Sequence, residues 1–101
     1  MEETRKPAEA CRTMAEVRRR VDSVDRALAR LIGERMRFME AAARIKPERG
    51  QVRDEPRKAE VIANARANAA ANGVPPDLAE ALWEQLVEGS IAYEFEVFDR
   101  R

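Results

Sequence analysis

The sequence predicts an all-α protein, a three-helix protomer whose first helix is by far the longest. Charged residues make up 38% of the 101 residues and aromatic residues only 5%, with abundant Ala, Arg, Glu and Leu. This composition favours helices and argues against a sheet or a barrel. Apolar residues also recur at alternating steps of three and four from Met14 onward, which is the pattern of a long helix packed against other helices.

The first helix is predicted from Thr13 to about Lys46. Thr13 followed by Glu16 is a capping-box pattern, and Pro47 stops the helix because it lacks an N–H donor. About 33 residues at roughly 1.5 Å each give a helix near 50 Å long. Residues 1–12 are predicted to form a flexible N-terminal tail, and residues 13–101 a single helical domain.

One charged residue, Arg35, interrupts the apolar seam of this helix. A guanidinium stays protonated in proteins, and leaving it buried and unpaired is unfavourable by several kcal/mol. Arg35 therefore either extends to solvent or pairs with a nearby Glu, or it meets an anionic ligand inside the bundle. The seam positions that frame it are Met14, Val17, Val21, Val24, Leu28, Leu31, Phe38, Ala42 and Ile45.

Two shorter helices follow a polar loop over residues 47–54. Asp54 is expected to cap the second helix, and Gly73 to end it in the left-handed conformation that glycine adopts easily. Asp77 is expected to begin the third helix, which reaches about Phe98. The predicted buried edge of the second helix consists of Ala59, Ile62, Ala65 and Ala69.

The first helix is too long for the other two to cover. An uncovered apolar seam in water is an association surface, so we expect a homodimer in which two first helices pair, in antiparallel orientation.

Composition also excludes several classes of function. Lys plus Arg and Asp plus Glu both number 19, whereas a nucleic-acid-binding protein normally has a basic surplus. A single cysteine and no histidine leave no intrachain disulfide, no metal-ligand cluster and no imidazole base, so no metal site is expected. No stretch has the apolar length of a membrane span or a signal peptide, which predicts a cytoplasmic protein.

Several polar residues share faces in a way that suggests an anion pocket. Lys46 follows Arg35 by eleven residues, which is three helical turns and about 16 Å on one face. Arg18 lies on the flank of the same seam, from which an antiparallel partner would bring it back toward Arg35. Ser90 and Glu94 form an i, i+4 pair within the apolar stripe of the third helix.

Each of these residues also has a purely structural interpretation. Ser90 is compatible with a small core residue bonded to its own backbone, and Glu94 with a structural ion pair. Lys46 is favoured at a helix C-terminus by the macrodipole whatever its function. Arg57, near Asp54, is compatible with an ordinary solvent-exposed face of the second helix. The functional interpretation is a pocket of fixed cations with one carboxyl group and no nucleophile.

The runs VRRRVDSVDRALARLIGERMRFMEAAARIK, VRDEPRK and EGSIAYE resemble the all-helical chorismate mutase family over about residues 14–98. The most specific matches are Arg18 followed by Asp25, then Arg35, and then Lys46. The resemblance implies an intertwined homodimer with two equivalent sites, each borrowing Arg18 from the other copy. It implies rearrangement of chorismate to prephenate in aromatic amino acid biosynthesis, in the shikimate pathway, without a cofactor.

The resemblance also implies roles for individual residues. Arg35 and the borrowed Arg18 would bind the substrate carboxylates, while Lys46 would reach the enolpyruvyl carboxylate and the ether oxygen. A protonated Glu94 would donate a hydrogen bond to that oxygen. The remaining contacts implied are Ser90 with the ring carboxylate, and Asp54 and Arg57 with the hydroxyl side of the ring.

Two departures from the family pattern leave alternatives open. Many bacterial members carry Gln in place of Glu94, and Lys58 stands where a Glu is usual. The first alternative is isochorismate-pyruvate lyase, a salicylate-forming relative that also lacks that Glu, or a mutase for an amino-substituted chorismate. The second is a non-catalytic helical dimer that regulates a partner enzyme. Retention of Asp54 and Ser90 favours the mutase.

Overall fold

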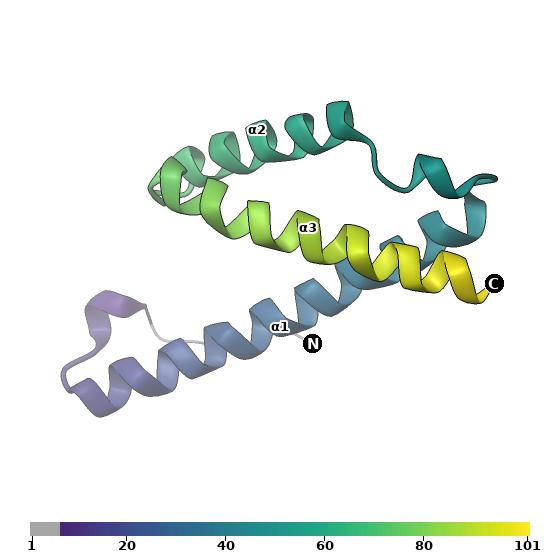
Figure 1. Ribbon diagram of the computed structural model, residues 1–101. Coiled ribbons are helices and arrows are strands. Elements are labelled where there is room, and N and C mark those ends of the chain that lie inside the picture. The colour runs from purple at the N-terminus through teal and green to yellow at the C-terminus, as the bar shows by residue number, and fades with distance from the viewer. Residues whose placement is uncertain (1–6) are drawn as a thin grey trace. The chain divides into compact units, whose positions relative to one another are not determined.

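The structure is a computed structural model that describes residues 7–101, and within that range it contains helices and no strand. The predicted all-α fold with three helices is confirmed. The elements, shown in Figure 1, are η1 (Ala8–Ala10), α1 (Met14–Ile45), η2 (Arg49–Gln51), α2 (Glu55–Ala71) and α3 (Pro76–Arg100).

Helix α1 begins and ends within one residue of its predicted bounds. The Glu16 backbone N–H donates to Thr13 Oγ1 at 3.2 Å, which is the expected cap. At the other end the Lys46 N–H still donates to the Ala42 carbonyl at 2.9 Å, and Pro47 then stops the helix. The predicted flexible tail falls partly on residues 1–6, which lie outside the described residues.

The chain divides into two compact units, one ending at Arg37 and the other comprising Phe38–Arg101. In the first unit the apolar stripe of α1 is open to solvent, with Val21 50%, Leu28 51% and Leu31 60% exposed. In a single chain this stripe is therefore exposed surface and not part of a buried core. The single domain and the pairing of first helices remain predictions.

Helix α2 begins and ends as its sequence predicts. Asp54 is the N-cap and its Oδ1 accepts a hydrogen bond from the Arg57 backbone N–H at 3.0 Å. Gly73 adopts φ +72° after the last turn, and the Val74 N–H returns to the Ala69 carbonyl at 2.8 Å. These are the marks of a Schellman C-cap.

Helices α2 and α3 run antiparallel and pack side by side (Figure 1). Small residues allow the close approach, since Ala65, Ala69 and Ala79 are 5%, 6% and 2% exposed. Ala59, which was predicted to belong to this buried edge, is exposed. The larger core cluster consists of Val52, Val87 and Ile91, flanked by Val61, Ile62, Trp83, Phe95 and Phe98.

The predicted start of the third helix at Asp77 is wrong by one residue. Helix α3 begins at Pro76 after Pro75, and no side chain caps it. The fixed φ of proline suits a first turn, and the carboxylate of Asp77 instead accepts a hydrogen bond from Arg66 at 2.9 Å. A contact between α2 and α3 thus replaces the local cap.

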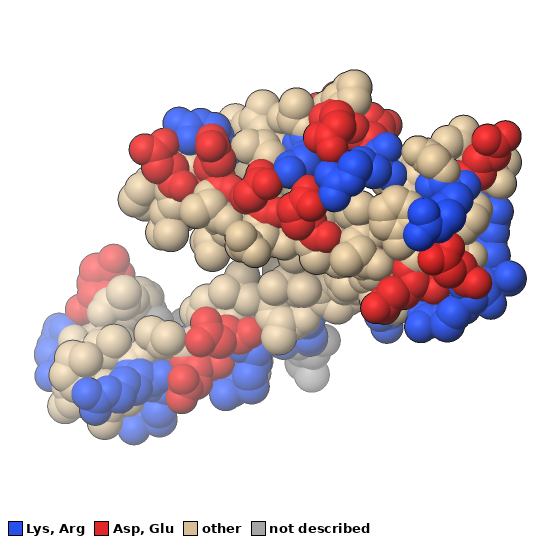
Figure 2. Space-filling view, viewed as in Figure 1, with Lys and Arg blue, Asp and Glu red and all other residues tan. Residues whose placement is uncertain are grey.

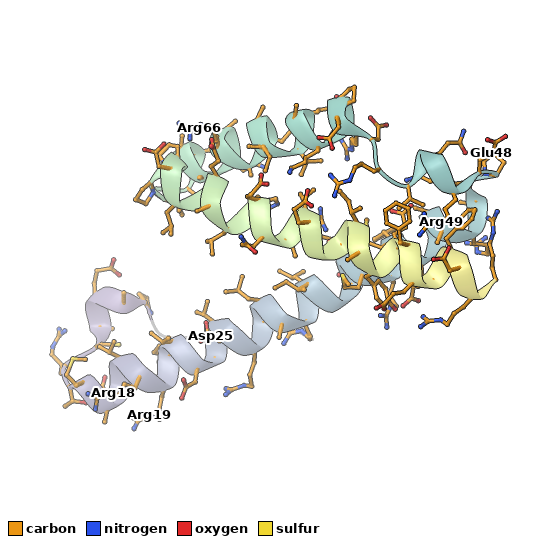
Figure 3. The ribbon with its side chains drawn as sticks, viewed as in Figure 1. Arg18, Arg19, Asp25, Glu48, Arg49 and Arg66 are labelled. Atoms are coloured by element: carbon orange, nitrogen blue, oxygen red, sulfur yellow. The ribbon has the colours of Figure 1, made fainter. Side chains whose placement is uncertain are left out.

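Basic side chains of the loop and of α2 pair with acidic ones of α3. Figure 2 shows blue and red groups intermixed along these two helices, and Figure 3 labels Arg66 near their connection. Arg53 contacts Glu88 at 2.7 Å, and Lys58 contacts the same residue at 2.8 Å. Hydrogen bonds from Arg53 and Lys58 lower the pKa of Glu88 to about 2.

Within the described residues, no helix combines the length and the apolar character that crossing a bilayer requires.

Candidate functional site

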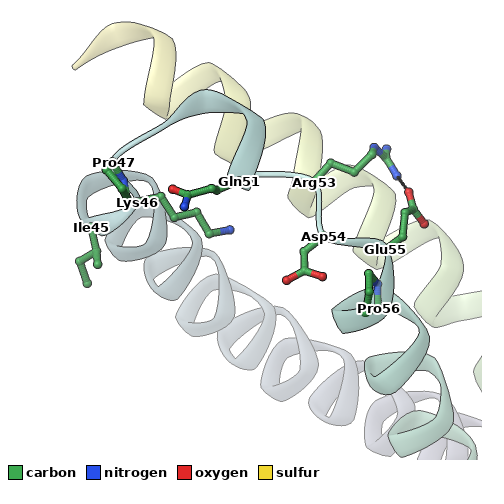
Figure 4. A pocket seen from close by; sticks show the side chains of 8 residues that line it. All are labelled: Ile45, Lys46, Pro47, Gln51, Arg53, Asp54, Glu55 and Pro56. Atoms are coloured by element: carbon green, nitrogen blue, oxygen red, sulfur yellow. Dashed lines mark hydrogen bonds and ion pairs between the residues drawn. The ribbon is translucent and has the colours of Figure 1, made fainter.

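A pocket lined by both charged and apolar side chains lies entirely within the second unit, where α1 ends, η2 follows and α2 begins. Its volume is about 650 Å³, large enough for a small organic anion. Figure 4 shows the residues that line it, which are Ile45, Lys46, Pro47, Gln51, Arg53, Asp54, Glu55 and Pro56.

Lys46 supplies an ammonium group that is partly shielded from water. It stands directly after α1, its side chain is 29% exposed, and its Nζ donates to Glu94 Oε2 at 2.8 Å. The Glu94 side chain is only 5% exposed, so the carboxylate is held inside the fold by α3. Residues 48 positions apart in the sequence thus form a charge pair beside the pocket.

Asp54 places a carboxylate on the same pocket. Its Oδ1 caps α2, so the side chain has a fixed direction, and Figure 4 shows Asp54 and Lys46 pointing into the same opening. The neighbouring Arg53 is turned toward Glu55 and Glu88, at 2.9 and 2.7 Å. Hydrogen bonds with Glu88 and then Glu55 raise the pKa of the Arg53 guanidinium above its ordinary value.

Ser90 and Glu94 lie one turn apart on α3, and both are buried, at 3% and 4% exposed. The Ser90 hydroxyl donates to the Leu86 carbonyl at 2.6 Å, which agrees with the structural interpretation of this residue. In the adjacent position, the Tyr93 hydroxyl donates to the carboxylate of Glu40 near the end of α1. The buried face of α3 is therefore polar where it meets α1.

Arg57 and Lys58 do not line this pocket. The Arg57 guanidinium pairs with Glu60 and its side chain is 61% exposed. The Lys58 ammonium donates to Glu84 and Glu88 on α3 at 2.7 and 2.8 Å, and these hydrogen bonds raise its pKa. The lysine that departs from the family pattern is thus engaged in holding α2 to α3.

Arg18 and Arg35 belong to the first unit and are described by themselves. Arg18 is exposed on α1, where Figure 3 labels it together with Arg19 and Asp25. Arg35 is half-buried. Of the seven predicted site residues, the second unit brings together Lys46, Glu94, Asp54 and Ser90.

Sequence reasoning missed Gln51 and Glu55 as pocket residues. The Gln51 side chain accepts from the Glu48 backbone N–H at 3.2 Å and completes a capping box around η2. The spacing of Glu48 and Gln51 carries this signal, since a residue three positions after an N-cap reaches back to it. The sequence offered no comparable signal for Glu55.

The arrangement is suited to binding and polarising an anion that also carries a hydroxyl group. An ammonium and a carboxylate face one pocket, and no group of His, Cys, Asp and Glu in the described part of the chain could hold a metal ion. The chemistry that these side chains supply is electrostatic stabilisation and positioning.

Comparison with known proteins identifies the family. The family model described as chorismate mutase type II matches residues 17–95. A curated relative named isochorismate pyruvate lyase, from Pseudomonas aeruginosa, is 28% identical over 87 residues, which cover 86% of each chain. The chain belongs to the chorismate mutase type II family.

Proposed function

We propose that this member of the family is a chorismate mutase, which rearranges chorismate to prephenate within the pocket beside Lys46. The observation that carries the proposal is the Lys46–Glu94 pair, at 2.8 Å, in which α3 holds an ammonium beside a pocket of suitable size. Membership in the family supplies the substrate class.

The reaction requires positioning more than acid or base chemistry. In one cyclic step the ether C–O bond of the enolpyruvyl side chain breaks while a C–C bond to the ring forms. Negative charge develops on the departing ether oxygen, and a fixed cation stabilises it more strongly in the transition state than in the ground state. We assign this task to Lys46, which would also bind the enolpyruvyl carboxylate.

Glu94 is proposed to assist Lys46 at the ether oxygen. A protonated carboxyl group can donate a hydrogen bond to that oxygen, whereas a carboxylate can only accept. In the structure Glu94 accepts from Lys46, so binding of substrate must exchange this contact for contacts with the ether oxygen.

The remaining contacts of the proposed site come from three places. Arg35 of the same chain and Arg18 of a second copy are proposed to bind the two substrate carboxylates by bidentate hydrogen bonds. Asp54 is proposed to accept a hydrogen bond from the ring hydroxyl, with Arg57 on the same side. Ser90 is proposed to help hold the ring carboxylate, which would require its hydroxyl to leave the Leu86 carbonyl.

A homodimer is part of the proposal, because Arg18 would come from the other copy. It is supported by the open apolar stripe of α1, in which Val17, Leu28 and Leu31 are 36%, 51% and 60% exposed. A stripe of this length is rarely left uncovered in a soluble protein. The proposed activity also carries the expectation of a cytoplasmic enzyme of aromatic amino acid biosynthesis.

Isochorismate-pyruvate lyase is the second candidate, and two observations favour it. The curated relative bears that name, and Lys58 stands where a carboxylate is usual. Retention of Asp54, which lines the pocket, and of Ser90 favours the mutase.

Turnover assays with separate substrates decide between these functions. Purified protein is incubated with chorismate or with isochorismate, and prephenate, salicylate and pyruvate are quantified. Prephenate from chorismate with a low rate on isochorismate supports the mutase. Salicylate plus pyruvate as the main products would establish the lyase, and no turnover of either substrate would favour the non-catalytic regulatory dimer.

A further inference from the structure

The carbonyl groups around Lys46 have an unexpected partner in the side chain of Arg101. The last carbonyls of an α-helix lack intrahelical donors, and Pro47 supplies no N–H of its own. Arg101 Nη1 donates to the Ala43 carbonyl at 2.9 Å and to the Lys46 carbonyl at 2.6 Å. Arg101 Nη2 donates to the Pro47 carbonyl at 3.1 Å.

The guanidinium is oriented by its own surroundings. It stacks over the ring of Phe98, with Cζ 3.7 Å from the ring centroid, and the Arg101 backbone N–H donates to the Phe98 carbonyl at 3.2 Å. A planar fork of donors fits several carbonyl oxygens at once, which a lysine ammonium at the same place does less well. The contacts are thus specific to the shape of arginine.

Lys46 is consequently held at both of its ends, by α3 and by the C-cap residue that follows this helix. Glu94 fixes the ammonium at 2.8 Å, and Arg101 fixes the backbone carbonyl of the same residue at 2.6 Å. Glu94 lies on α3, and Arg101 is the C-cap residue that follows this helix, seven positions later. The lysine side chain therefore spans two anchors that α3 and its C-cap supply.

We propose that Arg101 is a positioning residue for Lys46: its guanidinium clamps the Ala43, Lys46 and Pro47 carbonyls and so sets where the Lys46 ammonium stands in the pocket. The clamp also holds the first residue of the loop that lines the pocket, because Pro47 is one of its wall residues. This inference rests on the proposed function, in which Lys46 acts on the substrate.

A double-mutant cycle measured with chorismate tests the assignment. We expect Arg101→Ala to lower kcat about tenfold with a smaller change in KM, because a misplaced cation loses mainly transition-state stabilisation. Arg101→Lys should recover part of this loss. Arg100→Ala, which removes an exposed arginine next to the clamp, is the matched control and should keep the parent kcat.

The cycle is completed in the Lys46→Ala background. If Arg101 acts through Lys46, adding Arg101→Ala to Lys46→Ala causes no further loss of kcat. The same fractional loss in both backgrounds, or a parent-like kcat for Arg101→Ala, would overturn the proposal.

Amide hydrogen exchange provides a readout that does not depend on turnover. Arg101→Ala should accelerate exchange at the amides of Lys46, Gln51 and Val52, whose hydrogen bonds frame the loop, and Arg100→Ala should leave them unchanged. Unchanged exchange in Arg101→Ala rejects the clamp even if the protein turns over chorismate. Lack of turnover in the parent, with accelerated exchange in the variant, would reject the enzymatic proposal and retain the clamp.

Discussion

The two compact units of this chain bury their apolar side chains to different extents. In the first unit the stripe of α1 lies open, and Leu28 and Leu31 are 51% and 60% exposed. In the second unit Val52 and Val87 are 3% and 6% exposed, although Val52 comes from a polar loop, while Ile45 at the end of the stripe stays 69% exposed. The more regular apolar pattern thus belongs to the less buried unit.

This difference shows what hydrophobic periodicity measures. A three-and-four repeat identifies the face that a helix will bury, while the partner that covers it can be another chain. Burying a Val or Leu side chain fully contributes about 1.5–3 kcal/mol, so a long open stripe represents substantial stability that a second copy would supply. The second unit obtains its burial from its own helices.

The largest effect is expected from a charge placed in the open stripe. Leu28→Glu should abolish both dimer formation and turnover of chorismate, since a carboxylate would have to be buried between the paired helices. Sedimentation measurements give the mass, and the turnover assay gives the activity. Ala29→Glu adds the same charge beside the seam and should preserve the dimer. A fully active monomer of Leu28→Glu would show that the first unit works without a second copy.

In the second unit the largest effect should follow from removing the pocket cation. Lys46→Ala is expected to lower kcat/KM by about 10²–10³-fold, the range measured when one transition-state donor is removed from an active site. Arg44→Ala removes an exposed cation of the same helical turn and serves as the control. Equal kinetics for the two variants would mean that the Lys46–Glu94 pair is structural.

A smaller effect is expected from changing the carboxyl group of the same pair. Glu94→Gln supplies an amide donor to the ether oxygen, whereas a carboxylate at the same place can only accept. The Gln variant should therefore keep or raise kcat/KM, while Glu94→Ala, which offers no donor, should lower it. If Glu94→Ala has the kcat/KM of the parent, Glu94 takes no part in the reaction.

The smallest effect concerns the charge pairs that hold α2 to α3. Arg53 and Lys58 lower the pKa of Glu88 from 4.5 to about 2, so folding favours its carboxylate form. The corresponding stability is present above pH 4.5 and is lost as the pH falls toward 2.

Glu88→Gln should therefore have a lower Tm than the parent at pH 6 and approach it near pH 2, as followed by circular dichroism. Glu96→Gln, at an exposed carboxylate of the same helix, is the control. A constant difference in Tm between Glu88→Gln and the parent across this range would contradict the linkage.

Most boundaries of the fold could be predicted because they depend on neighbouring residues. Pro47 removes a donor, Asp54 caps the next helix and Gly73 takes φ +72°, each within a few positions of where it acts. The exception was Asp77, whose carboxylate is engaged by Arg66 from another helix. Local rules failed where a contact between helices competed with them.

Spacing also suggested the residues of the candidate site, but it did not reveal their partners. Lys46 and Glu94 each interrupt an apolar pattern, and both were assigned to the site from the sequence. The Arg101 contacts with α1 and the engagement of Lys58 by Glu84 and Glu88 carried no sequence signal. Such pairings depend on which helix faces meet, which no single segment encodes.

The sequence by itself determined three helices, the caps at Thr13, Asp54 and Gly73, and the interrupted apolar stripe of α1, since backbone preferences and helical periodicity act over a few residues. Only the tertiary structure decided that Glu94 of α3 and its C-cap Arg101 hold the ammonium and the carbonyl of Lys46, across 48 and 55 positions of the chain. The reason is that hydrogen bonds and ion pairs between helices form only after packing has brought their faces within about 3 Å.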